Sequence, residues 1–283
     1  MVAVVGAVAL ASTPLLLSPT GASASGSPTA SRAATPHIKA TLTKKTITVT
    51  GTNGLKAGRV DLSVKGKGIV EFAMFKRGYD AGDFVADVNK FGAKNDIKAL
   101  KRALANTQIL GGLSGGGSGS IVFPKPGSYT PFSLGDRGVV TGDPVVVRGP
   151  AGSSKLPRTD GKIIGKSGPS WGGASHLPMK GSFELKNKGN TGVPHFVVLQ
   201  QVAEGTTTDQ VLEFLQTSDE NTPPPAFLLA GSLETGSVSP GRSMTVDYDL
   251  PAGQYVVMCF FPDPKMGGMP HALMGMLEMI HLM

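Results

Sequence analysis

Polar and apolar residues alternate along short stretches throughout this chain. The alternation is clear in Thr46-Ile-Thr-Val-Thr50, in Phe183-Glu-Leu-Lys186 and in Ser243-Met-Thr-Val-Asp-Tyr-Asp-Leu250. A period of two places one set of side chains on a core and the other towards solvent, as in a half-buried β-strand. The chain also has 39 glycines and 21 prolines among its 283 residues, so turn residues separate the short apolar runs. Together these patterns predict an all-β fold.

The pattern occurs twice, with a period of about 125 residues. Lys125-Pro-Gly-Ser-Tyr129 aligns with Pro251-Ala-Gly-Gln-Tyr255, and Glu71 aligns with His195. In each copy a polar N-cap precedes apolar residues at helical spacing, at 80–88 and at 206–215, which predicts one short helix per copy. We therefore expect two tandem Greek-key β-sandwiches, at 41–150 and 158–283, joined by a linker over 149–157.

The N-terminal segment has the features of an export signal. Residues 2–17 are mostly apolar and are followed by the small residues Gly21-Ala-Ser-Ala24, which predicts a signal peptide over 1–24 and a secreted, extracellular protein. Residues 25–40 are rich in Ser, Ala, Thr, Pro and Gly, and we expect them to form a disordered spacer. The apolar run is interrupted at Thr13-Pro14, and we expect no membrane span in the mature chain.

The net charge of +7 favours association with an acidic redox partner or an anionic polymer of the cell surface. Lys and Arg are never clustered in runs longer than two, and the chain has four tyrosines and one tryptophan. With export expected as well, this composition argues against a nucleic-acid partner.

The chemistry of the chain centres on Cys259, its single cysteine. A secreted chain with one cysteine cannot form an internal disulfide, so the thiol must be buried or occupied. His271 and Met276 follow within the same stretch, and His195 starts an earlier strand. Two imidazoles, one thiolate and a weak thioether are the ligands of a type-1 (blue) copper centre. Met274 competes with Met276 as the axial ligand, and the spacing after Gly275 favours Met276.

The C-terminal half resembles the cupredoxins, in particular the plastocyanin- and azurin-like domains of secreted actinobacterial proteins. The resemblance is carried by Gly253-Gln-Tyr-Val-Val-Met-Cys259, by His271 with Gly275-Met276, and by Pro194-His195. It implies that His195, Cys259, His271 and Met276 bind one copper ion. Eleven residues separate Cys259 from His271, a longer loop than in many cupredoxins. We expect this loop to reach the surface and His271 on it to be the exit for electrons.

The first copy lacks these ligands. Ser133 takes the place of Cys259, and no His or Met follows it before Val145. The resemblance therefore implies a degenerate N-terminal repeat without metal and an electron-transfer protein with one type-1 copper. It does not favour an oxidase or nitrite reductase, because Met258 and Phe260 flank the cysteine and no His-x-His occurs. Two alternatives remain: a Cu(I) chaperone or store that uses the methionines of 266–276, and a metal-free cupredoxin-like scaffold.

Overall fold

The fold is described by a computed structural model that covers residues 35–135, 138–149, 152–219 and 221–283. The predicted signal peptide and most of the predicted spacer lie outside these residues. Strand β1 (His37–Leu42) nevertheless begins inside the predicted spacer. Ile38 and Ala40 are fully buried, whereas His37 and Lys39 are exposed. Residues 37–40 therefore belong to the sheet, because their alternating pattern gives the core two side chains.

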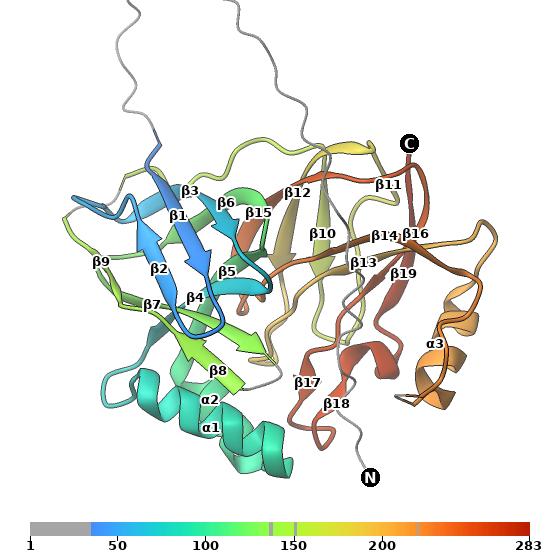
Figure 1. Ribbon diagram of the computed structural model, residues 1–283, viewed down its shortest axis with the longest axis horizontal. Coiled ribbons are helices and arrows are strands. Elements are labelled where there is room, and N and C mark those ends of the chain that lie inside the picture. Colours follow the sequence, from blue (N-terminus) through green and yellow to red (C-terminus); the bar gives the residue numbers. More distant parts are fainter. Residues whose placement is uncertain (1–34, 136–137, 150–151, 220) are drawn as a thin grey trace, which may run out of the picture.

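The first half of the chain is a sandwich of two sheets (Figure 1). Phe72 on one sheet and Phe123 on the other pack edge to face between the layers, with ring centroids 5.8 Å apart. The strands of one sheet are, in order, β2 (Ile47–Thr50), β1, β3 (Gly58–Lys65) and β6 (Ser118–Phe123). Those of the other are β5 (Thr107–Ser114), β4 (Ile69–Phe75), β7 (Gly127–Gly135) and β8 (Gly138–Thr141), and β9 (Val145–Val147) also pairs with β7.

The strands that the two halves have in common follow one order. The two strands of the second half that correspond to β1 and β3 are likewise parallel, and the other corresponding neighbours are antiparallel in both halves. One sheet contains β10 (Gly161–Gly165), β12 (Lys180–Asn187) and β15 (Ser243–Asp249). The other contains β14 (Leu228–Glu234), β13 (Val198–Val202), β16 (Gly253–Met258), β19 (Leu277–Leu282) and β11 (His176–Leu177). The predicted all-β class is thus confirmed.

Both predicted helices are present, and each begins with a capping box. Asp80 and Asp83 cap α1 (Ala81–Lys94), and Thr207 and Gln210 cap α3 (Thr208–Thr217). The first half contains a further helix, α2 (Ile97–Asn106), whose inner face is formed by Ala99, Leu100 and Ala103. The pattern of one helix per copy did not predict it. Among the described residues, no helix is long and apolar enough to span a membrane.

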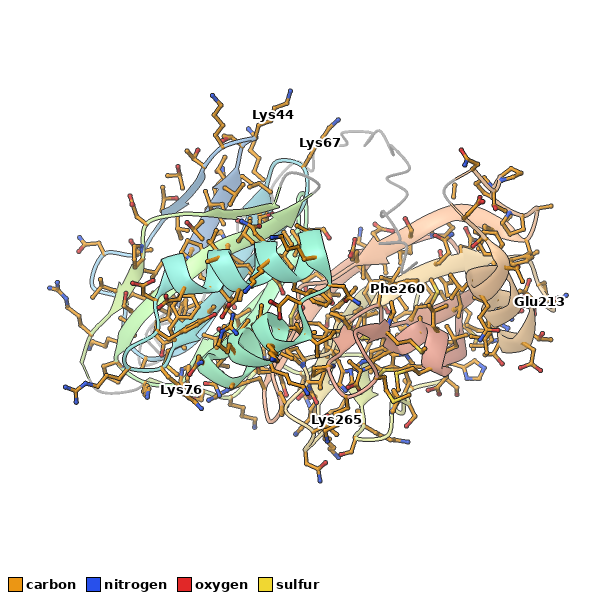
Figure 2. The ribbon with its side chains drawn as sticks, turned by 90° about the horizontal axis from the view of Figure 1, so that it is seen from below. Lys44, Lys67, Lys76, Glu213, Phe260 and Lys265 are labelled. Carbon is orange, nitrogen blue, oxygen red and sulfur yellow. The ribbon has the colours of Figure 1, made fainter. Side chains whose placement is uncertain are left out.

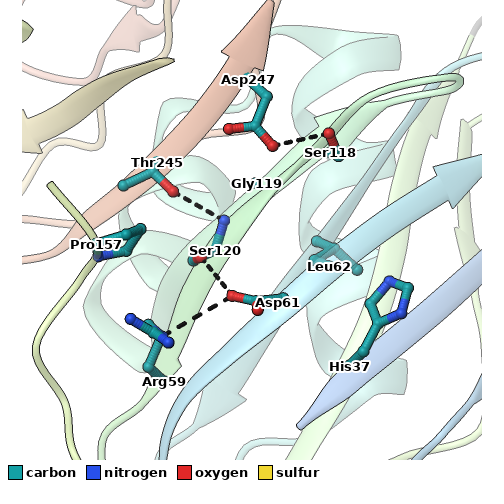
Figure 3. A pocket seen from close by; sticks show the side chains of 10 residues that line it. All are labelled: His37, Arg59, Asp61, Leu62, Ser118, Gly119, Ser120, Pro157, Thr245 and Asp247. Carbon is teal, nitrogen blue, oxygen red and sulfur yellow. Dashed lines mark hydrogen bonds and ion pairs between the residues drawn. The ribbon is translucent and has the colours of Figure 1, made fainter. Parts of the chain in front are cut away.

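The two halves share a sheet. Strand β6 of the first half pairs with β15 of the second, so that seven strands run continuously in the order β10-β12-β15-β6-β3-β1-β2. Polar contacts cross this seam: the backbone N–H of Ser120 donates to Thr245 Oγ1 (3.0 Å), and the Ser118 hydroxyl donates to Asp247 (2.8 Å). The residues that make these contacts line an open pocket on the outer face of the sheet (Figure 3). The halves are therefore held by strand pairing as well as by the linker between them.

A second set of contacts joins β5 to residues 235–239 of the second half. The N–H of Gly236 donates to Gly112 O, and that of Ser239 donates to Ile109 O, both at 2.9 Å. The carboxylate of Glu71, on the neighbouring strand β4, is buried here and accepts the N–H of Ser237. Burial raises the pKa of Glu71 to about 7, against the opposing effect of the Ser237 hydrogen bonds. An ionisable group is thus enclosed between the halves.

Candidate metal centre

Cys259 directly follows β16, the strand between β13 and β19. Tyr255, Val257 and Cys259 alternate along this stretch and all belong to the main core, whereas Val256 and Met258 belong to a separate cluster with Val211 of α3. The two-residue period of the strand therefore directs the thiol into the sandwich. Cys259 is fully buried.

The backbone around His195 is fixed by hydrogen bonds. His195 forms an isolated antiparallel bridge with Val238, with N···O distances of 3.1 and 2.8 Å. The wholly buried side chain of Asn187 donates to the carbonyls of Val193 (3.0 Å) and Val238 (2.9 Å). Gly165 lies against the imidazole, because a Cβ built at this position would be 2.6 Å from ring atom Cδ2. The imidazole is therefore held by tertiary contacts on its backbone and on its ring.

The long loop between Cys259 and His271 is an ordered hairpin. Strands β17 (Pro262–Asp263) and β18 (Met269–Pro270) pair, and the 3₁₀ helix η1 (His271–Met274) follows. The N–H of His271 donates to Phe261 O (3.1 Å), and that of Ala272 donates to Cys259 O (2.6 Å). The hairpin thus returns the chain to the cysteine despite the eleven intervening residues.

The three predicted strong ligands converge. Cys259 Sγ lies 3.8 Å from Nδ1 of His195 and 3.6 Å from Nδ1 of His271, and the three donor atoms lie within 4.8 Å of one another. In a metal site with bonds of about 2.3 Å to sulfur and about 2.0 Å to nitrogen and an S–metal–N angle of about 120°, the sulfur and the nitrogen lie about 3.7 Å apart. The two observed sulfur–nitrogen separations therefore fit one ion bound between the sulfur and each imidazole.

Burial governs the protonation of the cluster. It raises the pKa of Cys259 to about 12, although the N–H groups of Phe196 and Phe261 favour the thiolate. It lowers the pKa of His195 to about 4, with a further lowering from the neighbouring His271. It lowers the pKa of His271 as well, against the opposing charge of Asp263. Without a cation the cluster holds a neutral thiol and neutral imidazoles, so that metal binding must release the thiol proton.

The outer nitrogens of the two imidazoles have different surroundings. Nε2 of His195 is buried and has no hydrogen-bond partner of normal geometry, although the nearby carbonyl of Lys166 acts to raise the pKa of the ring. Nε2 of His271 lies 3.8 Å from Asp263 Oδ2, within ion-pair range but too far for a hydrogen bond. Nδ1 of both rings faces the sulfur, so Nε2 of each ring is directed away from it.

The loop reaches the surface at Met266 and Met269, but the side chain of His271 is itself buried. Its exposed fraction is 2%, because the hairpin folds back and places Asp263 against its ring. Phe260 and Phe261, which directly follow Cys259 in the chain, are partly exposed, and Phe260 is labelled in Figure 2.

Met276 is fully buried in the same core as Cys259, whereas Met274 is partly exposed. The N–H of Met276 donates to His271 O (3.0 Å), and its carbonyl accepts from Trp171 Nε1 (3.2 Å). Trp171 also lies beside His195, with ring centroids 6.1 Å apart. No signal in the sequence indicated that Trp171, Asn187 and Asp263 lie around the cluster, because their contacts join residues that are far apart in the chain.

The other histidines lie apart from this cluster. His176 and His281 stack on each other with ring centroids 5.8 Å apart, and His37 contacts the Ser63 hydroxyl. Among the described residues, His195, Cys259 and His271 form the single group of three His, Cys, Asp or Glu side chains that could hold a metal ion.

One detail of the repeat alignment requires correction. Phe132 pairs with Glu71, and Met258 pairs with Val198. If Ser133 takes the place of Cys259, the strand pairing therefore aligns Glu71 with Val198 and not with His195. The earlier alignment was displaced by three residues, because both strands carry similar apolar patterns that allow either register.

No protein-family model matches the chain, and no curated protein matches it. Among solved structures, dithionite-reduced auracyanin from the photosynthetic bacterium Roseiflexus castenholzii is 20% identical, with a TM-score of 0.28, over 43% of this chain and 94% of that one. Auracyanin B is 21% identical, with a TM-score of 0.27, over 43% and 86%. A multicopper oxidase is 11% identical, with a TM-score of 0.26, over 87% and 88%. Likenesses at this level do not establish a family.

Proposed function

We propose that this protein binds one type-1 copper ion through His195, Cys259 and His271, with Met276 as axial ligand, and carries single electrons. The observation that carries the proposal is the convergence of a buried thiol with Nδ1 of two buried imidazoles, all within 4.8 Å. Full burial of Met276 beside His271 supports its choice over Met274.

The donor set favours copper over zinc. Structural zinc sites use four strong tetrahedral ligands, and catalytic zinc sites use three together with water. Asp263, the carboxylate nearest to the cluster, faces Nε2 of His271 and thus lies on the side of the ring away from the sulfur. A thiolate, two imidazoles and a thioether in a dry core match the set that type-1 copper uses.

Copper in such a site supplies reversible one-electron chemistry. The chain holds the donors in one arrangement: β16 fixes the thiol, the bridge to Val238 fixes His195, and the hairpin fixes His271. Burial excludes water from the three donors and keeps the surroundings of low polarity. A fixed, dry ligand set limits the rearrangement that accompanies each change of charge.

We propose electron transfer without catalysis. Enzymes built from such domains need a second copper centre, and His37, His176 and His281 do not approach the cluster or form one among the described residues.

One observation favours the alternative of a Cu(I) chaperone or store: Met266 and Met269, on the hairpin beside His271, are 51% and 41% exposed. Export and an acidic redox partner complete the proposal, supported by the N-terminal pattern and the charge of +7.

The test is a visible absorption spectrum of the purified chain during titration with Cu(II). We expect an intense blue band that saturates at one copper per chain and is abolished in Cys259→Ser. If the protein is colourless and retains Cu(I), copper storage becomes the proposed function in place of electron transfer. Failure to bind either ion would make the chain a metal-free scaffold and refute the proposal.

A further inference from the structure

One residue at the tip of the ligand hairpin, Gly268, is buried against the first half of the chain. Lys265, Met266, Gly267 and Met269 are exposed, but Gly268 between them is buried. A Cβ built on Gly268 would lie 3.0 Å from Asn95 Oδ1, 3.1 Å from Phe91 Cε2 and 3.2 Å from Ile97 Cδ1. These three residues form the corner at which α1 ends and α2 begins, and we call them the helix corner. Figure 2 shows the two helices beside the segment that carries Lys265.

Asn95 makes a polar contact with the same tip. Its Nδ2 donates to Gly267 O at 3.4 Å, a long hydrogen bond. Asn95 is also the one described non-glycine residue with positive φ (50°), and its N–H closes α1 by donating to Phe91 O. The left-handed turn that ends the helix thus also directs the amide towards the hairpin.

The tip is connected to His271 through Asp263. The Asp263 carbonyl accepts the N–H groups of Gly268 (2.8 Å) and Met266 (3.1 Å), and its Oδ1 accepts that of Lys265 (2.7 Å). Its other carboxylate oxygen lies 3.8 Å from Nε2 of His271. Carboxylates in this position orient the imidazoles that bind metals. A displacement of the tip would therefore move Asp263, whose carboxylate faces the imidazole of His271.

We infer that the helix corner is a positioning element for the metal centre: Phe91, Asn95 and Ile97 hold the hairpin tip, and through Asp263 they hold His271. This inference rests on the proposed copper function and assigns a role to the first half of the chain, whose described residues contain no such group of donors. A long ligand loop needs external support to remain rigid, and the helix corner supplies it in place of a shorter loop.

The test compares Asn95→Gly and Phe91→Ala with Asn89→Ala in the full chain. Glycine accepts the left-handed conformation, so Asn95→Gly keeps the end of α1 and removes only the contact with the hairpin. Asn89 is the matched control, because it lies on the same helix and contacts the N–H of Val139 within the first half. Hydrogen exchange of Gly268 and His271 in the metal-free protein reports on the hairpin, since both N–H groups are bonded within it.

We expect about tenfold faster exchange of these amides in Phe91→Ala and Asn95→Gly, and no change in Asn89→Ala. With Cu(II) bound, the same two variants should shift the thiolate-to-copper bands and release copper to a chelator about tenfold faster. Unchanged exchange would refute the inference that the helix corner holds the hairpin, even if copper binds. Faster exchange with an unaltered copper spectrum and release rate would show a structural contact without positioning. If the parent chain binds no copper, the proposed function fails, while the exchange data still decide whether the corner holds the hairpin.

Discussion

Replacing Glu71 by glutamine should make the protein more stable at neutral and alkaline pH. Glu71 is 4% exposed and lies where β4 meets residues 235–239 of the second half. Burial is the largest cause of its raised pKa, and the charge of Glu234 adds to it. Glutamine has the same shape and can still accept the N–H of Ser237, but it has no charge to bury.

The magnitude follows from the pKa of Glu71, which rises from the ordinary 4.5 to about 7 in the folded state. At about 1.36 kcal/mol per pH unit, full ionisation lowers the free energy of unfolding by about 3.4 kcal/mol. The folded state holds its proton more tightly than the unfolded chain, so stability is complete below pH 4.5 and is lost as the pH rises through 7. Between pH 5 and pH 8 the parent should lose about 2.5 kcal/mol relative to Glu71→Gln.

The assay is urea unfolding of both metal-free proteins from pH 5 to pH 8, followed by the fluorescence of Trp171. The difference between the two proteins at each pH cancels the contributions of the other carboxylates. Glu213→Gln is the control for the change of side chain, because Glu213 is exposed on α3. A constant difference between parent and Glu71→Gln across this range would refute the assignment of a buried carboxyl that ionises near neutrality.

Four further substitutions test the candidate metal centre and its surroundings. Met276→Leu should leave copper bound but raise its reduction potential, because loss of a weak donor favours the ion of lower charge, Cu(I). Voltammetry measures this potential. A shift in Met274→Leu and none in Met276→Leu would make Met274 the axial ligand. Asn187→Ala removes the donors to two buried carbonyls, and we expect a loss of about 2–4 kcal/mol in urea unfolding. Gly165→Ala adds a Cβ 2.6 Å from the His195 ring, and isothermal titration should show at least tenfold weaker Cu(II) binding; unchanged affinity would show that the ring can move.

Much of the secondary structure was predictable because it depends on near neighbours. Alternation within 243–250 places Met244, Val246 and Tyr248 in the core, as the pattern predicts. The capping boxes at Asp80 and Thr207 mark both helix starts. The ligand types were also legible, because Cys259 and His271 lie on one loop and few side chains have their chemistry.

The surroundings of the cluster were not predictable, because they depend on contacts between distant residues. The buried state of His271 follows from the pairing of β17 with β18, and the sequence suggested only a longer exposed loop. The alignment of Glu71 with His195 failed for a related reason. Similar apolar patterns fit two registers, and only the hydrogen bonds between strands distinguish them.

The sequence by itself determined the all-β class, the starts of α1 and α3, and the identity of three donors that lie together. These properties arise from periodicity and from side-chain chemistry, which act over a few residues. The tertiary structure alone decided that β6 pairs with β15, that Asn187 and Gly165 hold His195, and that the helix corner contacts Gly268. Each of these depends on how complete sheets and helices pack, because backbone groups and ring faces find their partners only once distant segments are in place.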